Sequence, residues 1–316
     1  MNHDYDMNKI LTYIQRAEKK KLILDTDTFN EIDDQYAVTY AMLADDIDLL
    51  ALTAAPFYNS RSTSPADGME KSYQELLHVR GLVDPDSKIP VCRGSRDYLK
   101  NTITPQESEA ADTIISIAEQ SDDIVFVAAI GCFTNVASAL LKKPSIADRI
   151  AVILIGGNDL RHESANEFNL QQDRAAARVI FECGVPVILL PAFDCTVGLL
   201  TTNAECAYYL GNGKGGAIGE YLVSIFEEDE GRSVGEDGFC HTRQRVIWDI
   251  GSVAFLRNPG RFCSLTVADT RTVDARGYWR ELHDGRKMIC AEHFDRNAVF
   301  SDLFTLVRAH ANANGK

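Results

Sequence analysis

The chain has 316 residues, of which 45% are hydrophobic and 25% charged, as in a soluble globular protein with room for a large core. Its 46 acidic residues outnumber the 32 lysines and arginines, and the resulting net charge of −14 disfavours binding to nucleic acid or to anionic membranes. The eight cysteines lack the spacing of a zinc site, so we expect reduced thiols in a cytoplasmic protein.

The N-terminal segment lacks the basic start and the apolar core of a signal peptide. Met7, Ile10, Leu11 and Ile14 have helical spacing, which predicts a helix that lies on the domain. No segment is long and apolar enough to span a bilayer. No linker is visible either, so we expect residues 1–316 to form a single domain.

Residues 20–38 contain an apolar run that ends in a cluster of acids. The run from Leu22 to Leu24 predicts a short buried strand, and a helix is expected to begin at Asp33. Four carboxylates fall within ten residues, at Asp25, Asp27, Asp33 and Asp34. Acids this close need a positive charge among them, and clustered carboxylate oxygens suit Ca²⁺ or Mg²⁺. In the alternative interpretation, the first two acids end the strand and the other two cap the helix.

Further strands and helices alternate along the chain. Apolar runs that predict strands occupy residues 47–55, 123–130, 150–155 and 185–194, and helical patterns lie between them. This order predicts an α/β fold, with an open, mostly parallel sheet flanked by helices. Gly156 and Gly157 follow the third of these strands, and we interpret them as a site of close backbone packing, because no GxGxxG motif is present.

Several polar side chains follow the predicted strands. Since the carboxyl ends of parallel strands share one edge of the sheet, these side chains should gather near the acid cluster. They are Asn59, Glu167 and Asn169, and the aromatic Phe168 lies between the last two. Asn59 could bond a polar ligand or could only shape a turn, and the EFN triplet at 167–169 could be a chance combination.

Residues 241–256 include a largely apolar helical pattern that contains Trp248 and Asp249. A carboxylate in so apolar a helix needs compensation. A cation at the acid cluster could provide it, and so could a salt bridge to Arg243 or Arg245. Trp248 either faces a ligand or packs in the core.

Six motifs follow one another along residues 20–260: DTDTFNEIDD, AAPFYN, AIGCFTN, ILIGGN, EFN and WD. In kind and in order they resemble the nucleoside hydrolases, also called inosine-uridine preferring nucleoside hydrolases. The resemblance implies a Rossmann-like fold and a single catalytic domain. It also implies calcium-dependent hydrolysis of the N-glycosidic bond of a nucleoside, to ribose and free base, in nucleoside salvage. Such enzymes are commonly homo-oligomers, so a dimer or tetramer is implied as well.

The resemblance also assigns roles to individual residues. The implied calcium ligands are the carboxylates of Asp27, Asp34 and Asp249 and the backbone carbonyl of Ile130. The implied contacts with the ribose are made by Asp33, Asn59, Glu167 and Asn169. Asp27 is also the implied general base, which takes a proton from a water activated by the metal. The negative charge around the sugar would favour the ribosyl cation that develops as the bond breaks.

The metal loop departs from the family pattern. Five residues, 28–32, separate Asp27 from Asp33, whereas the usual family motif has three. The two extra residues widen the loop and could place Asn30 or Glu31 inside the pocket. The family's GNxTP turn before the EFN triplet is also missing.

The residue at the position that faces the leaving group also departs from the family pattern. The family's frequent histidine just before the late aspartate is replaced here by Trp248. In this the chain is similar to the purine-preferring branch, in which an aromatic ring stacks on the base, so a purine nucleoside is an implied substrate. His241, seven residues earlier, is a candidate acid for the leaving group.

Two other functions fit parts of the sequence. The segment LILDTDT resembles the aspartyl-phosphate motif of haloacid dehalogenase-type phosphatases, with Asp25 as nucleophile and Asp27 as acid-base, although Phe29 departs from that motif. The chain could also be a homologue that binds a ribosyl ligand or a metal without catalysis, because the wider loop could have removed activity.

Overall fold

The computed structural model describes residues 7–16, 19–228 and 244–315, and its centre is an eight-stranded sheet. The strand order is β3-β2-β1-β4-β5-β6-β12-β9, and every neighbouring pair is parallel except β12 and β9. These strands are β1 (Lys20–Thr26), β2 (Ile47–Ala54), β3 (Val91–Cys92), β4 (Val125–Ala129), β5 (Ile150–Ile155), β6 (Val187–Leu190), β9 (Cys263–Asp269) and β12 (Lys287–Phe294). The predicted α/β fold, with an open and mostly parallel sheet, is confirmed.

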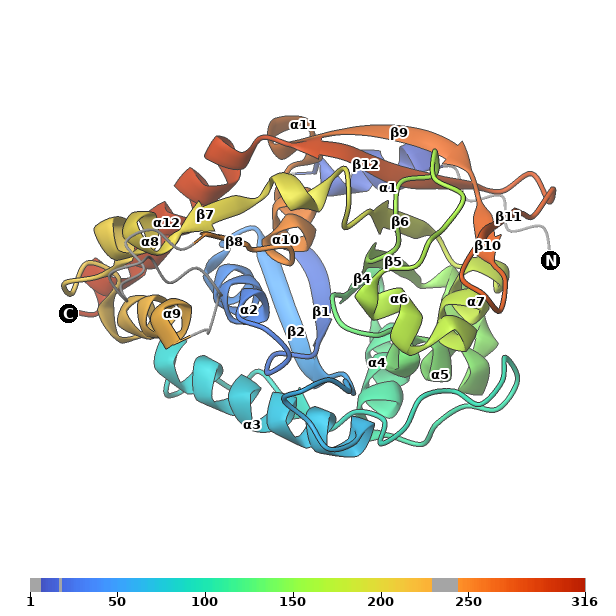
Figure 1. Ribbon diagram of the computed structural model, residues 1–316, viewed down its shortest axis with the longest axis horizontal. Coiled ribbons are helices and arrows are strands. Elements are labelled where there is room, and N and C mark those ends of the chain that lie inside the picture. Colours follow the sequence, from blue (N-terminus) through green and yellow to red (C-terminus); the bar gives the residue numbers. More distant parts are fainter. Residues whose placement is uncertain (1–6, 17–18, 229–243, 316) are drawn as a thin grey trace, which may run out of the picture.

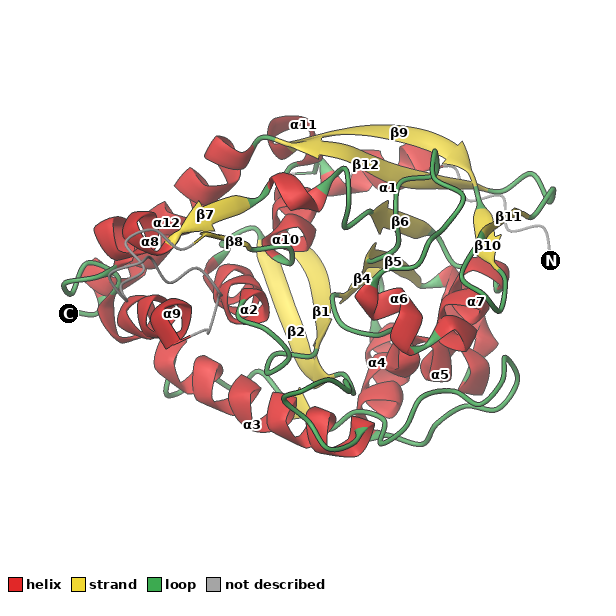
Figure 2. Ribbon diagram, viewed as in Figure 1, coloured by secondary structure: helices red, strands yellow, loops and turns green. Residues whose placement is uncertain are grey.

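Helices cover both faces of this sheet (Figures 1 and 2). One face packs against α1 (Met7–Ile14), α2 (Asp33–Leu43), α3 (Pro65–Val83), α8 (Asn203–Leu210), α9 (Gly216–Glu228), α10 (Ile250–Arg257), α11 (Pro259–Phe262) and α12 (Arg296–Ala313). The other packs against α4 (Glu109–Gln120), α5 (Thr134–Lys142) and α7 (Arg174–Glu182). In β1, Leu22 and Leu24 belong to the first core and Ile23 to the second. Because both faces are covered, the central strands are continuous apolar runs.

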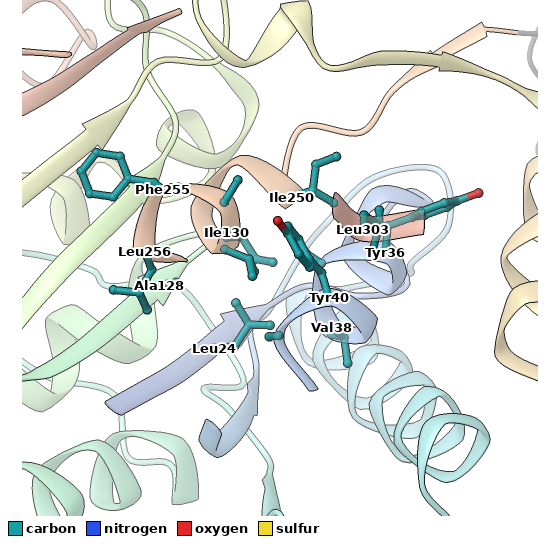
Figure 3. Packing of buried hydrophobic residues seen from close by; sticks show 14 of the residues in the cluster. Leu24, Tyr36, Val38, Tyr40, Ala128, Ile130, Ile250, Phe255, Leu256 and Leu303 are labelled. Carbon is teal, nitrogen blue, oxygen red and sulfur yellow. The ribbon is translucent and has the colours of Figure 1, made fainter. Parts of the chain in front are cut away.

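The packing of α2 and α10 against β1 and β4 forms the core beneath the strand ends (Figure 3). Leu24, Ile130 and Ile250 are buried there beside two tyrosines. The hydroxyl of Tyr36 donates to the carbonyl of Leu222 at 2.8 Å, and the hydroxyl of Tyr40 donates to Asp302 Oδ2 at 2.6 Å. Both phenols are therefore satisfied although they are buried, and their bonds tie α2 to α9 and α12.

The late apolar helix is shorter than the sequence predicted. It begins at Ile250, so Trp248 and Asp249 precede it instead of lying within it. The cause is a small antiparallel ribbon between β7 (Leu200–Thr202) and β8 (Gln244–Val246). The amide of Ile247 also donates to the carbonyl of Leu199 at 2.8 Å, which keeps the segment before the helix extended.

The remaining elements are short or peripheral. They are η1 (Pro144–Asp148), α6 (Phe168–Gln172), η2 (Thr196–Gly198), β10 (Arg271–Val273) and β11 (Trp279–Glu281). Within the described ranges, no helix combines the length and the apolar character needed to cross a membrane. The seven cysteines in these ranges are free thiols, as predicted, and Cys240 lies outside them.

Candidate active site

A cavity of about 230 Å³ lies at the carboxyl ends of β1, β4, β5 and β6. Strands β1 and β4 are neighbours, but the helix that follows β1 packs on one face of the sheet and the helix that follows β4 packs on the other. The chain therefore diverges at this point and leaves a crevice outside the strand ends. Open α/β sheets bind their ligands at such switch points.

Acidic side chains are the most numerous polar groups of the cavity. Six carboxylates line it: Asp27, Glu31, Asp33, Asp34, Glu167 and Asp249. Asp33, Asp34 and Asp249 each offer an oxygen within 4.8 Å of the other two. Asp27 is 1% exposed, and its Oδ2 has no hydrogen-bond partner among the described residues. The predicted acid cluster is thus joined by an aspartate from more than 200 residues away in the sequence.

Local structure holds these acids in place. Asp27 directly follows β1, while Asp33 and Asp34 form the first turn of α2, whose dipole favours negative charge. The N-cap position of this helix is Ile32, which makes no side-chain cap. Thr26 Oγ1 donates to Asp34 Oδ1 at 2.5 Å and fixes that carboxylate. The alternative in which the two acids serve only as caps is therefore not what the structure contains.

Burial raises the pKa of these carboxyl groups. For Asp27, Asp33 and Asp249 the pKa lies well above its usual range, first because of burial and then because of repulsion from neighbouring carboxylates. Burial also raises the pKa of Asp34 to about 7. The charged groups that act most strongly on Asp249 are other carboxylates, which argues against the salt bridge to Arg245; Arg243 lies outside the described residues. Hard oxygen donors that repel one another in this way fit a divalent cation.

Asn169 connects the ends of two strands at the cavity. Its Nδ2 donates to the carbonyl of Ile130 at 2.8 Å and to the carbonyl of Ile155 at 3.1 Å. Ile130 lines the cavity, as predicted for a carbonyl ligand, and a carbonyl oxygen has a second lone pair for another partner. The amide of Asn169 therefore positions the strand ends, a role that its sequence position did not reveal.

Glu167 lines the cavity but uses its carboxylate locally. It caps α6 by accepting from the amides of Asn169 at 3.0 Å and Leu170 at 3.3 Å, and it also accepts from the amide of Gly157 at 3.0 Å. Gly157 has a φ of +70°, and a Cβ on Gly156 would lie 2.8 Å from the ring of Phe133. The interpretation of the glycine pair as close backbone packing is confirmed.

Asn59 does not line the cavity, because Asn30 lies between Asn59 and the cavity. Asn30 is 7% exposed and lines the cavity, whereas Asn59 does not. The Nδ2 of Asn59 donates to Asn30 Oδ1 at 2.5 Å, and the backbone amide of Asn30 donates to the carbonyl of Asp27 at 2.7 Å. Asn59, which the resemblance implied as a ribose contact, thus lies outside the cavity lining and reaches it only through its bond to Asn30. The wider loop inserts this residue without separating the acids.

Three aromatic residues complete the cavity: Phe168, Phe193 and Trp248. The rings of Phe193 and Trp248 lie edge to face, with centroids 6.0 Å apart and an interplanar angle of 74°. Trp248 therefore faces the cavity instead of the core. Phe193 was not predicted as a site residue, although its place just after β6 matches that of the other residues that follow strands at this edge of the sheet. His241 lies outside the described residues.

Asp25 is excluded from the cavity. Its side chain is fully buried, and its Oδ1 accepts from Thr53 Oγ1 at 2.6 Å and from Asn135 Nδ2 at 2.8 Å. The network ties β1 to the end of β2 and to the start of α5, and burial raises the pKa of Asp25 to about 7. A carboxyl group enclosed in this way cannot attack a phosphate, so the phosphatase interpretation is wrong.

Comparison with known proteins identifies the family. The sequence model of the inosine-uridine preferring nucleoside hydrolases matches residues 22–301. The chain belongs to this family. It is therefore an N-glycosyl hydrolase that acts on ribonucleosides, in a family whose members depend on a metal.

Relatives of this nucleoside hydrolase have two named specificities. The pyrimidine-specific ribonucleoside hydrolase RihA of Enterobacter sp. (strain 638) is 24% identical over 271 residues, which cover 77% of this chain and 81% of RihA. The purine-preferring ribonucleoside hydrolase from Gardnerella vaginalis has the same fold, with a TM-score of 0.73 at 23% identity, covering 93% of this chain and 100% of that one. The plant nucleoside hydrolase PpNRh1 matches with a TM-score of 0.70 at 20% identity, covering 92% of this chain and 99% of PpNRh1.

A methyl group at Gly131 should disturb the site of this hydrolase. Its Cβ would lie 2.9 Å from Cγ of Asp27 and 3.0 Å from the backbone nitrogen of that residue. We expect Gly131→Ala to lower kcat by about 10- to 100-fold, because small misplacements of a reacting group are costly. Steady-state kinetics on inosine and uridine measure this. Gly81→Ala is the control, because nothing lies within 4 Å of that position, and equal kcat values for the two variants would contradict the account.

Stability without metal should depend on pH. A carboxyl whose folded pKa lies above its unfolded value of 3.8 makes the folded state bind more protons, so stability falls as pH rises from about 4 to about 7. Chelated protein should therefore have a higher Tm at pH 5.5 than at pH 8, and Ca²⁺ should raise the Tm at pH 8. Asp34→Asn should show a smaller difference between the two pH values. A Tm of chelated wild type that is equal or higher at pH 8 would contradict this.

Proposed function

We propose that this cavity hydrolyses the N-glycosidic bond of a nucleoside with the help of Ca²⁺. The observation that carries the proposal is a group of buried carboxylates beside three aromatic rings, in one cavity at the switch point of the sheet. The acids suit a cation and a sugar, and the rings suit a base. A single catalytic domain over residues 1–316 is part of the proposal.

The proposed calcium ligands are Asp27, Asp34, Asp249 and the carbonyl of Ile130. Several carboxylates with a backbone carbonyl form a donor set of the kind Ca²⁺ accepts in flexible geometry. The free Oδ2 of Asp27 and the mutual repulsion of the acids support this set. When bound, the cation supplies positive charge that offsets the carboxylates and lowers the pKa of a coordinated water.

Asp27 is the proposed general base. Its carboxylate lines the cavity with an oxygen that no described residue bonds, so it is available to take a proton from the attacking water. Asp33 and Asn30 are proposed to accept hydrogen bonds from the ribose hydroxyls and so to orient the sugar, together with Glu167 and Asn169. Their negative charge and dipoles favour the ribosyl cation as it develops.

Asn59 is proposed as a positioning residue that acts through its bond to Asn30. Trp248 is proposed to stack on the base, which supports a purine substrate because a purine offers the larger face. The names of the relatives point both ways, to pyrimidine and to purine nucleosides. His241 is proposed as the acid that protonates a neutral base as it leaves.

A homo-oligomer, either a dimer or a tetramer, in the cytoplasm completes the proposal. The free thiols of the described cysteines are consistent with a reducing compartment. Each protomer has a mass of 35.0 kDa, so light scattering distinguishes the assemblies.

Removing the proposed base tests the function. Asp27→Asn keeps the shape of the side chain but cannot take the proton, so kcat on inosine and uridine should fall by about 100- to 10,000-fold. Its circular dichroism spectrum should match that of wild type. Asp48→Asn, an exposed acid on β2, is the control and should retain full turnover. Normal turnover by Asp27→Asn would refute the assignment.

A further inference from the structure

We propose that the cavity selects ribonucleosides whose base carries a positive charge on its ring, such as a pyridinium or an N-alkylated purine. The inference rests on the proposed function and narrows its substrate class. Its basis is the combination of acids and aromatic rings around one cavity, not any single residue.

The lining of the cavity is strongly acidic. Six carboxylates line the cavity, and no lysine, arginine or histidine is among the lining residues that the structure describes. A divalent cation offsets two of these negative charges. Of the carboxylates outside the proposed ligand set, Asp33 is 6% exposed and Glu167 is half-buried, so solvent screens their charge only in part, whereas Glu31 is exposed. A cationic ligand is favoured in such a cavity.

The aromatic rings indicate where in the cavity a cationic base would bind. Phe168, Phe193 and Trp248 line the same cavity as the acids, and the last two lie edge to face. The face of an aromatic ring carries partial negative charge and attracts a cation placed over it. A cationic base bound against these rings would gain this attraction, whereas a neutral base gains only stacking.

The chemistry of the leaving group agrees with this choice. Hydrolysis breaks the bond between C1′ and the ring nitrogen, and the electron pair of that bond goes to the nitrogen. Water supplies the oxygen for the new bond to C1′, and its proton goes to Asp27 and then to solvent. A cationic base leaves as a neutral molecule and needs no acid, whereas a neutral base leaves as an anion that must be protonated. Trp248, which stands where the family often has a histidine, can stack on either kind of base but cannot protonate a neutral one, which would need the proposed acid His241.

Selectivity ratios test the proposal. Nicotinamide riboside is the cationic substrate and uridine the neutral one, since each base is a single six-membered ring. With the calcium-loaded enzyme, we expect the ratio of their kcat/KM values to fall about 2- to 30-fold in Phe193→Leu and in Trp248→Leu. The greater intrinsic lability of the cationic substrate cancels when each variant is divided by wild type. Tyr208→Leu should leave the ratio unchanged, because this exposed ring lies outside the cavity and already faces Lys214.

A binding measurement separates this inference from the reaction. The cation 1-methylnicotinamide should inhibit uridine hydrolysis at least about tenfold more strongly than neutral nicotinamide, and it should raise the Tm of Asp27→Asn. Equal inhibition, or a ratio unchanged in both aromatic variants, would overturn the inference while leaving nucleoside hydrolysis intact. Selective binding of the cation without release of ribose from any nucleoside would instead overturn the proposed function.

Discussion

The burial of like-charged carboxylates at one point of the sheet is the constraint on which the site depends. Asp33, Asp34 and Asp249 bring their oxygens within 4.8 Å of one another, and Asp27 lines the same cavity. Such a group is costly in isolation, because burial and repulsion both disfavour the charged forms. The surrounding core holds it nonetheless, since α2 and α10 pack firmly against β1 and β4 (Figure 3). A bound cation would relieve the repulsion among the carboxylates, and this relief would contribute to the affinity of the site for metal.

The same geometry separates the functions of acids that are close in sequence. Asp25 lies within β1 and Asp27 directly follows its last residue, so one accepts hydrogen bonds from Thr53 and Asn135 while the other lines the cavity. The first acid joins the strand ends together and the second is free for chemistry. A phosphatase of the kind considered above would need both acids in the cavity. The distinction arises because β1 ends at Thr26 and the chain turns at Asp27, whereas residues two apart in a continuing strand would share one face.

Much of the fold was predictable, because the central strands are short apolar runs separated by helical patterns. For Asp249, burial in an apolar segment left two partners open, a cation at the first acids or a nearby arginine. Only the resemblance favoured the first, since nothing local to that residue reveals a partner more than 200 positions away. The start of α10 was mispredicted because β8 pairs with β7, a tertiary contact without a local signal. Phe193 and the bond between Asn59 and Asn30 were also missed, since side-chain direction in loops depends on the loops around them.

Nucleoside hydrolysis by this chain is proposed to require a divalent cation bound at the carboxylate cluster. The most direct measurement follows ribose release from inosine and uridine after chelation, while free Ca²⁺ is titrated back. We expect ribose release to stop on chelation and to return along a saturable calcium curve, which Asp249→Ala shifts to higher concentration or abolishes. Full ribose release from thoroughly chelated protein, or an unchanged calcium curve in that variant, would contradict it.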